Sequence, residues 1–247
     1  MNRPLHLPDA TKLSEVCEVT WPPASRQHLG AWTIRDGQGA GNRVSAATED
    51  WPVTEADLPA AEAAMRALGQ PPLFQIREGE EKLDALLEAH GYILRDPVNL
   101  WAVSVADLLK EPIPRAAAYT MWPPLELVRE IWQDGGIGAA RQAVMERATC
   151  PKAAILARMG DYPGGAAYVG LHDGIAMVHA IHVLPAQRRK GAGGLLLRAA
   201  AKWAEGHGAE ILGLIVTQGN HAANPLYASL GMTRVGNYHY RIHPHAV

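Results

Sequence analysis

One short stretch constrains this chain more than any other, because there an apolar strand runs into a glycine-rich turn and then into a helix. The strand ends at Pro185, the turn reads Arg-Arg-Lys-Gly-Ala-Gly over residues 188–193, and an apolar helical pattern follows from Leu195. Such a turn directs several backbone N–H groups and the positive end of a helix dipole at one point, and its glycines let a ligand approach closely. The basic side chains add charge suited to phosphate. The stretch therefore predicts a site for an anion such as a pyrophosphate.

The details of this turn exclude two common phosphate loops. A Walker loop requires G-x-x-x-x-G-K-[ST], which is absent, and a Rossmann turn would need glycine where Leu196 stands. What remains is R-x-x-G-x-G after Val-Leu-Pro, which resembles the acetyl-CoA pyrophosphate-binding motif of the GNAT N-acetyltransferases. Taken alone, the turn also fits a solvated basic segment that opens an ordinary amphipathic helix.

A second motif lies downstream, in the stretch QGNHAANPLYASLGM over residues 218–232. It resembles the GNAT pattern N-x-x-A-x-x-L-Y-x-x-x-G-F, with methionine replacing the final phenylalanine. The matching residues are Asn220, Ala223, Leu226, Tyr227 and Gly231. Two ordered motifs separated by a helix and a strand are far more specific than either one alone.

The resemblance implies a GNAT-like α+β fold over residues 113–247, with a mixed, mostly antiparallel sheet flanked by helices and with acetyl-CoA as the acyl donor. The strands at 176–184 and 211–217 would splay apart, so that exposed backbone groups pair with pantetheine as an added strand would. A backbone N–H near Val183 would polarise the thioester carbonyl. The donor contacts that the resemblance implies are Ile181, Val183, Arg188, Arg189, Lys190, Gly191, Ala192, Gly193, Gly194 and Asn220.

The catalytic candidates are one tyrosine and two histidines. The resemblance implies that Tyr227 protonates the departing CoA thiolate, since a phenol of pKa about 10 stays protonated at neutral pH beside a thiol of pKa about 8.5. A tyrosine packed between domains is the alternative. Some family members use a glutamate on the central strand as the base, but this strand has none, which leaves His179 and His182. Three residues apart on a strand, they are expected to face opposite sides.

The chain is expected to divide near residue 112, within the proline-containing segment LLKEPIPR. Residues 1–112 would form an N-terminal α+β domain, a partial, degenerate copy of the domain at 113–247, and would shape the acceptor pocket where the two halves meet. Strands are expected at 28–36 and 42–48, around the glycine-rich turn 37–42. That turn imitates a dinucleotide fingerprint, but its third glycine is missing.

Composition limits the partners of this protein of 247 residues. The formal net charge of −2 argues against general nucleic-acid binding. No stretch is apolar enough to span a bilayer and no signal peptide is evident, so a cytoplasmic protein without a membrane partner is expected. Neither the two distant cysteines nor the terminal His239, His243 and His245 have the spacing of metal ligands, so no metal is expected. A homodimer is left open.

The sequence thus predicts an enzyme that transfers an acetyl group from acetyl-CoA to a primary amine of a small molecule or peptide by direct attack, with Tyr227 as general acid. Two alternatives remain: a CoA-binding sensor or scaffold without turnover, and a nucleotide-binding protein unrelated to CoA. Nothing in the sequence identifies the acceptor amine.

Overall fold

A computed structural model describes residues 6–244 of the chain, so that His245, one of the terminal histidines considered above, lies outside the described residues. The elements of the first half follow the predicted α+β class. They are α1 (Ala10–Thr20), β1 (Ser25–Leu29), β2 (Trp32–Asp36), α2 (Asn42–Ser45), β3 (Thr48–Glu49), the 3-10 turn η1 (Glu55–Asp57), α3 (Leu58–Ala67), β4 (Leu73–Arg77), α4 (Glu81–Ala89), β5 (Ile93–Ser104) and α5 (Val105–Leu108).

The second half continues the same mixture of strands and helices, and the strands expected at 176–184 and 211–217 are found as β9 and β10. Its elements are β6 (Ala118–Met121), α6 (Glu126–Asp134), α7 (Ala139–Arg147), β7 (Lys152–Met159), β8 (Tyr162–His172), β9 (Ile175–Val183), the 3-10 turn η2 (Pro185–Gln187), α8 (Ala192–Gly206), β10 (Ile211–Thr217), α9 (Ala223–Ser229) and β11 (Thr233–Ile242).

Most of these strands form one sheet in the order β4-β11-β5-β10-β9-β8-β7-β6. All neighbours in it are antiparallel except β9 and β10, which are parallel. A separate small sheet has the order β1-β2-β3. The predicted mixed and mostly antiparallel sheet is therefore confirmed.

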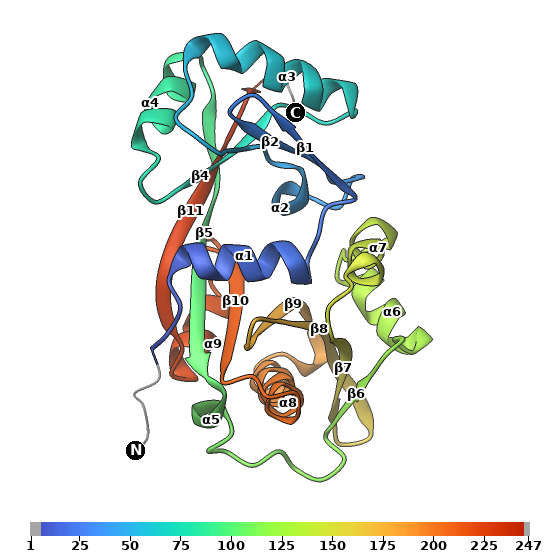
Figure 1. Cartoon of the computed structure of the whole chain (residues 1–247). Helices are drawn as coiled ribbons and strands as arrows, with labels where there is room; N and C mark the ends of the chain where they lie inside the picture. Colours follow the sequence, from blue (N-terminus) through green and yellow to red (C-terminus); the bar gives the residue numbers. More distant parts are fainter. Residues whose placement is uncertain (1–5, 245–247) are drawn as a thin grey trace.

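The two halves of the chain exchange strands within this sheet. Strand β5, from the first half, lies between β10 and β11 of the second, and β11 in turn lies between β5 and β4. Figure 1 shows both long strands running from the lower part of the molecule into the upper part. The expected join near residue 112 falls in the connection between α5 and β6, but the sheet itself continues across the two halves.

The order of elements repeats between the halves. The second half runs β9-α8-β10-α9-β11 and the first runs β3-α3-β4-α4-β5, each with a helix joining two strands that point the same way. The pairing of β9 with β10 is parallel, and an isolated parallel bridge joins Ala47, just before β3, to Phe74 in β4. This repetition agrees with the expected partial copy of one fold in the first half.

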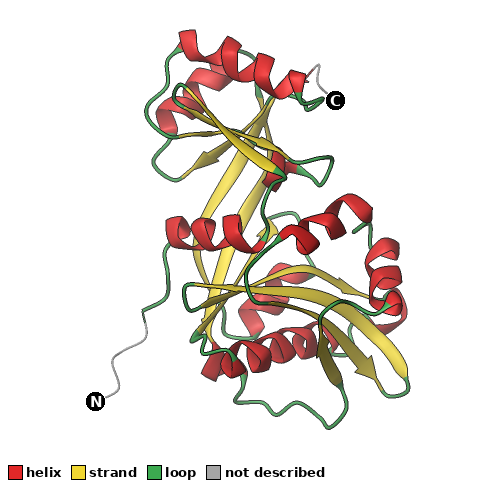
Figure 2. Cartoon of the chain, turned by 45° about the vertical axis from the view of Figure 1, so that its right-hand side comes forward, coloured by secondary structure: helices red, strands yellow, loops and turns green. Residues whose placement is uncertain are grey.

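Helices cover both faces of the large sheet (Figure 2). On one face α8 packs against β7, β8 and β9, and on the other α1 and α6 pack against β8 and β9. A separate cluster of buried residues, around Trp32, Phe74 and Leu87, forms the core of the upper part of the molecule in Figure 1. Because α8 packs on β9, the glycine-rich turn that connects them lies at the end of that strand.

One local prediction in the first half is wrong. The hairpin is formed by β1 and β2 around Gly30, whose φ of +56° suits a tight turn, and residues 42–45, expected as strand, form the short helix α2 instead. The alternating pattern of apolar residues there is too short to distinguish a strand from a helix. Gly41, with φ of +103°, precedes this helix and turns the chain into it.

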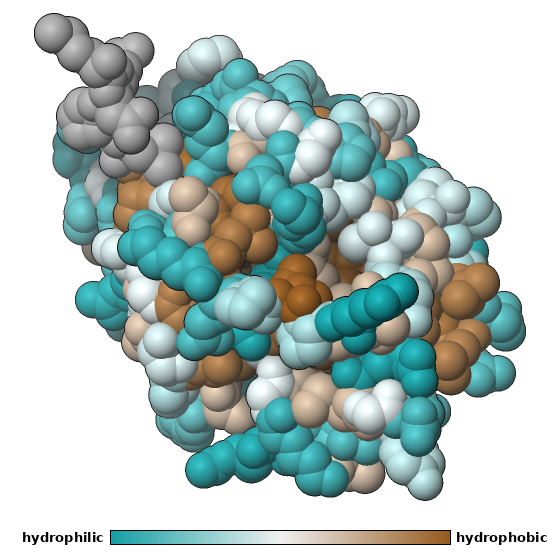
Figure 3. All heavy atoms as spheres, turned by 90° about the horizontal axis from the view of Figure 1, so that it is seen from below, coloured by the Kyte–Doolittle hydropathy of each residue, from teal (hydrophilic) through white to brown (hydrophobic). Residues whose placement is uncertain are grey.

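The described helices and one face of the surface show how apolar residues are distributed. None of the helices within residues 6–244 combines the length and the apolar character needed to cross a membrane. Figure 3 views the molecule from below and shows a largely hydrophilic surface with smaller hydrophobic areas between.

Candidate active site

The site begins where two parallel strands separate. Strands β9 and β10 pair from Ile175 opposite Ile211 to Val178 opposite Leu214, and the pairing ends there although both strands continue. The remaining residues, 179–183 and 215–217, border an open wedge. The splay expected between these strands is confirmed.

A bulge in β9 shapes one edge of the wedge. Ala180 has φ of +51°, and the register with β8 shifts there, so that His179 pairs with Tyr168 while His182 pairs with Ala166. Residues two apart on β8 share a face of the sheet, and directly paired residues lie on the same face. The prediction that the two histidines face opposite sides is therefore wrong, because the extra residue at Ala180 restores His182 to the face of His179.

The glycine-rich turn has the geometry of an anion site. Gly191 adopts the left-handed conformation at φ of +91° and is the N-cap of α8, which begins without a side-chain cap. The first N–H groups of the helix therefore lack intrahelical partners. Arg188, Arg189 and Lys190 are exposed beside them, and in the described part of the chain none of the three forms an ion pair.

A cavity of about 870 Å³, here called the turn cavity, opens between β9, this turn and α9. It is lined by nine of the ten predicted donor contacts, and Lys190 is the one outside the lining. The nine are Ile181, Val183, Arg188, Arg189, Gly191, Ala192, Gly193, Gly194 and Asn220. At Gly193 a Cβ would stand 2.7 Å from the Leu226 side chain, so glycine there lets α8 and α9 approach closely.

Tyr227 lies on α9 between the turn cavity and the core. Its side chain is only 5% exposed and packs edge-on against Trp101, with 6.3 Å between ring centroids. Burial raises its pKa to about 12, so the phenol is protonated at neutral pH. No other described residue forms a hydrogen bond with its hydroxyl, which leaves the proton available to a ligand in the cavity.

Asn224, which sequence reasoning did not single out, fixes the loop before α9. Its amide donates to the carbonyls of Thr217 and Asn220, both at 3.0 Å, and its oxygen accepts from Asn99 at 3.0 Å and from the Trp101 indole at 3.2 Å. Because β5 supplies the last two donors, the strand from the first half positions the loop that carries Asn220. The sequence could not reveal this role, because it does not show that the two halves exchange strands.

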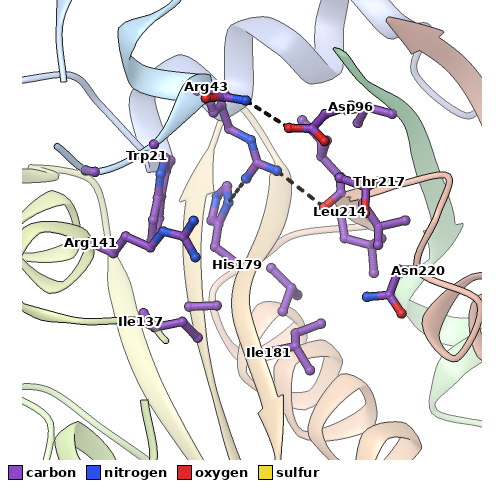
Figure 4. Close-up of a pocket in the computed structure, with 18 of the residues that line it drawn as sticks. Trp21, Arg43, Asp96, Ile137, Arg141, His179, Ile181, Leu214, Thr217 and Asn220 are labelled. Atoms are coloured by element: carbon purple, nitrogen blue, oxygen red, sulfur yellow. Dashed lines mark hydrogen bonds between the residues drawn. The ribbon is translucent and has the colours of Figure 1, made fainter. Parts of the chain in front are cut away.

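A second cavity of about 540 Å³, here called the seam cavity, lies between residues of the two halves (Figure 4). The first half contributes Trp21, residues 40–43 and residues 95–98, and the second half contributes α7 and the separated ends of β9 and β10. Ile181, Asn220 and Tyr227 line this cavity as well as the turn cavity. The two cavities are therefore neighbours that share these three residues of their walls.

His179 lies in the wall of the seam cavity with both ring nitrogens engaged. Nδ1 stands 3.3 Å from Nη1 of Arg43, and Nε2 stands 2.9 Å from Oγ1 of Thr20. A guanidinium can only donate, so Nδ1 accepts and Nε2 carries the proton. Burial, followed by the charge of Arg43, holds the pKa of His179 well below its usual value. His179 is therefore a neutral residue that orients Arg43.

His182 has a different environment, in the lining of the turn cavity. Its Nε2 is buried and has no hydrogen-bond partner among the described residues. The ring packs so tightly on Gly135, after α6, that a Cβ there would stand 2.5 Å from the ring's Cγ. Burial and then the charge of Arg188 lower its pKa, which leaves a neutral imidazole able to accept a proton.

Residues 6–244 contain few other groups that could carry chemistry. Within that range no group of three or more His, Cys, Asp or Glu side chains could hold a metal ion, and Cys17 and Cys150 are both free thiols. Tyr227, His182 and the glycine-rich turn together line the turn cavity.

Sequence comparisons agree with this geometry. The family model for the acetyltransferase (GNAT) family matches residues 118–232. The chain is also 27% identical, over 95% of its length and 98% of the relative's, to the uncharacterized N-acetyltransferase YobR of Bacillus subtilis (strain 168).

Solved structures share the fold over nearly the whole chain. A GCN5-related N-acetyltransferase from Kribbella flavida is similar over 95% of each chain, with a TM-score of 0.69 at 22% identity. A tandem GNAT protein from the clavulanic acid biosynthesis pathway is similar over 93% of this chain and 86% of its own, with a TM-score of 0.62 at 12% identity. With its two motifs, its splayed strands and this family match, the C-terminal half of the chain, over residues 118–232, is an acetyltransferase domain of the GNAT family.

Proposed function

We propose that this protein transfers the acetyl group of acetyl-CoA to a primary amine of a small molecule or peptide by direct attack. The observation that carries the proposal is that the turn cavity and the seam cavity share Tyr227 in their walls. One cavity has the charges and the backbone donors for a pyrophosphate, and the other is also lined by Tyr227. A donor and an acceptor can therefore meet there.

The turn cavity suits acetyl-CoA as acyl donor. The pyrophosphate would accept from the free N–H groups at the start of α8 and from Arg188 and Arg189, while pantetheine would pair with the exposed edge of β9 around Ile181 and Val183. A backbone N–H in this segment would polarise the thioester carbonyl. These contacts place the thioester near Tyr227, which lines both cavities.

In the reaction, the nitrogen of a neutral amine attacks the thioester carbonyl carbon and forms the new C–N bond. The C–S bond then breaks, and the CoA thiolate takes the proton of the Tyr227 hydroxyl. A pKa of about 12 keeps that proton in place until the thiolate appears. The phenolate is then reprotonated by solvent or by the proton that the amine loses.

The amine must lose a proton, and we assign its removal to His182, directly or through a water molecule. Its lowered pKa keeps the ring neutral, and its Nε2 has no partner in the described chain. His179, the other candidate, already accepts a hydrogen bond from Arg43 at Nδ1. The structure therefore favours His182 over His179 as the base.

The proposal is tested by measuring thiol release from acetyl-CoA with pools of primary amines, for the wild type and for Tyr227→Phe. We expect release that depends on amine, and a kcat lowered by about 100-fold or more in the variant with the Kd for acetyl-CoA almost unchanged, because only proton transfer is lost. Ala228→Ser, an exposed change on the same helix at a position outside both cavities, would serve as a control for disturbance of α9. Equal turnover in Tyr227→Phe would remove the phenol from the mechanism, and binding of acetyl-CoA without any release would favour the sensor alternative.

A further inference from the structure

The wall of the seam cavity carries more positive charge than the protein itself balances. Its lining contains three arginines, Arg43, Arg95 and Arg141, against a single carboxylate, Asp96. That carboxylate is already engaged, since it accepts from Asn42 at 3.0 Å and lies 3.7 Å from Nε of Arg95. Two guanidinium groups of the lining are thus left without an acidic partner among the described residues.

Arg43 is the more telling of the two because it is partly buried. Its Nη1 donates to His179 and its Nη2 to the carbonyl of Ile215, at 3.3 and 3.4 Å, which are long contacts to neutral acceptors. Its Nε is enclosed without any partner. Since arginine stays charged in proteins, the site retains a whole positive charge, and its partners His179, Ile215 and the Tyr238 hydroxyl are all neutral.

The surroundings of Arg43 hold it in this position. His179 accepts at Nδ1 and is fixed through Nε2 by Thr20, whose hydroxyl in turn donates to the carbonyl of Val16 at 2.9 Å. Trp21 stacks on the His179 ring with 5.0 Å between centroids. Burying a charge costs free energy, and an anion bound to Arg43 would offset that cost.

Arg141 reaches the same cavity from the second half. It stands on α7, is exposed, and forms no hydrogen bond or ion pair with another described residue. Its guanidinium lies so close to Gly41 that a Cβ there would stand 3.4 Å from Nη2. Figure 4 shows the side chains of Arg43 and Arg141 both directed into the cavity, with Ile181 and Asn220 on its far side.

We infer that the acceptor amine also carries a carboxylate, which binds to Arg43 with the help of Arg141. This inference rests on the proposed function and names its substrate class: an amino acid, or a peptide with a free terminal carboxylate, whose amine points toward Tyr227. A planar carboxylate needs only two N–H donors from a guanidinium. A phosphate would call for more donors, and two of the Arg43 donors already serve His179 and Ile215.

The test is thiol release from acetyl-CoA with matched sets of amines. Each set contains an amino acid or dipeptide with a free carboxylate, its carboxamide, and its aminophosphonate analogue. The wild type is expected to prefer the free acid in kcat/KM by about 10- to 150-fold, the worth of one charge-assisted contact. The same preference should shrink to near unity in Arg43→Gln and partly return in Arg43→Lys, while Arg66→Gln, outside both cavities, should keep it.

Binding of acetyl-CoA, measured by calorimetry for every variant, separates this inference from the proposed function. A wild type that binds acetyl-CoA and acetylates carboxamides as well as acids would overturn the carboxylate assignment alone, as would a preference for the phosphonates. If Arg43→Gln does not fold, Arg141→Gln must reduce the preference for acids, and an unchanged preference there would count against the inference. A wild type that acetylates no amine of any set would remove the proposed function itself.

Discussion

At the scale of single residues, the hydrogen bonding of His179 and His182 distinguishes their roles. His179 is locked between Arg43 and Thr20, whereas Nε2 of His182 has no partner among the described residues. The sequence could name both side chains but could not separate them, because the bulge at Ala180 that turns them to one face depends on the pairing of β9 with β8. The difference between them is therefore tertiary in origin.

The assignment of His182 as base predicts a particular pH dependence. A base works only in its neutral form, and burial with the charge of Arg188 lowers its pKa below 6.5, so it should stay active at pH 6.5 and lose activity at lower pH. The neutral fraction of the acceptor amine also falls as pH falls, which alone gives log(kcat/KM) a slope of about 1. We expect that slope to steepen to about 2 below the pKa of His182 in the wild type.

The variants that check this prediction are His182→Gln and the exposed His172→Gln. The kcat/KM of His182→Gln should be lower by about 100-fold or more, and its logarithm should keep a slope of about 1 against pH throughout. His172→Gln should follow the wild type. A steeper acid limb that persists in His182→Gln would show that another group is the base.

At the scale of elements, the sequence predicted the strand, turn and helix of the donor site closely. The apolar helical pattern expected after the turn is found as α8, which begins at Ala192, and nine of the ten predicted contacts line the turn cavity. Those positions follow from local patterns of glycine and apolar residues. Residues 42–45 were predicted incorrectly as strand, since a short alternating pattern does not decide between strand and helix. Arg43 in that segment, and Asn224, escaped notice because their roles depend on the other half of the chain.

The connection between β10 and α9 gives a prediction about Asn224. In Asn224→Ala the loop would lose its bonds to the carbonyls of Thr217 and Asn220, and the amide of Asn99 and the indole of Trp101 would lose their acceptor. We expect a loss of about 2–3 kcal/mol in the free energy of unfolding, since buried donors would be left unpaired. Urea unfolding measures it.

Binding of acetyl-CoA should also weaken in Asn224→Ala, because this loop borders both cavities. Ser229→Ala is the matched control for stability, since that exposed hydroxyl makes a single bond to the Leu226 carbonyl on the same helix. If Asn224→Ala were as stable as Ser229→Ala, the loop would not depend on the contacts from β5.

At the scale of the whole molecule, the exchange of β5 and β11 makes each half depend on the other. The sequence suggested two domains joined near residue 112, and a local pattern cannot show that a strand will pair with a distant one. The first half fixes the loop before α9 through β5 and supplies Arg43 to the seam cavity. A partial copy of the fold has thus become part of the site of the complete one.

This interdependence predicts that residues 113–247 do not fold alone. Without β5, strands β10 and β11 lose the neighbour that they share, and a row of backbone groups is left unpaired. We expect no cooperative thermal transition from this fragment, and a single transition from the intact chain. Adding residues 1–112 as a separate chain should restore the transition. A fragment that melts cooperatively and binds acetyl-CoA by itself would show that the halves are independent.

The most direct test of the account is calorimetric titration of the intact protein with acetyl-CoA. We predict one site per chain, with binding weaker by about 10-fold or more in the double variant Arg188→Glu/Arg189→Glu, because both guanidinium groups line the turn cavity. The double variant Arg66→Glu/Lys202→Glu, with the same change of net charge at exposed positions outside both cavities, should bind as the wild type does. No binding of acetyl-CoA or CoA, or binding that is equal in the two double variants, would contradict the assignment of the glycine-rich turn as the donor site.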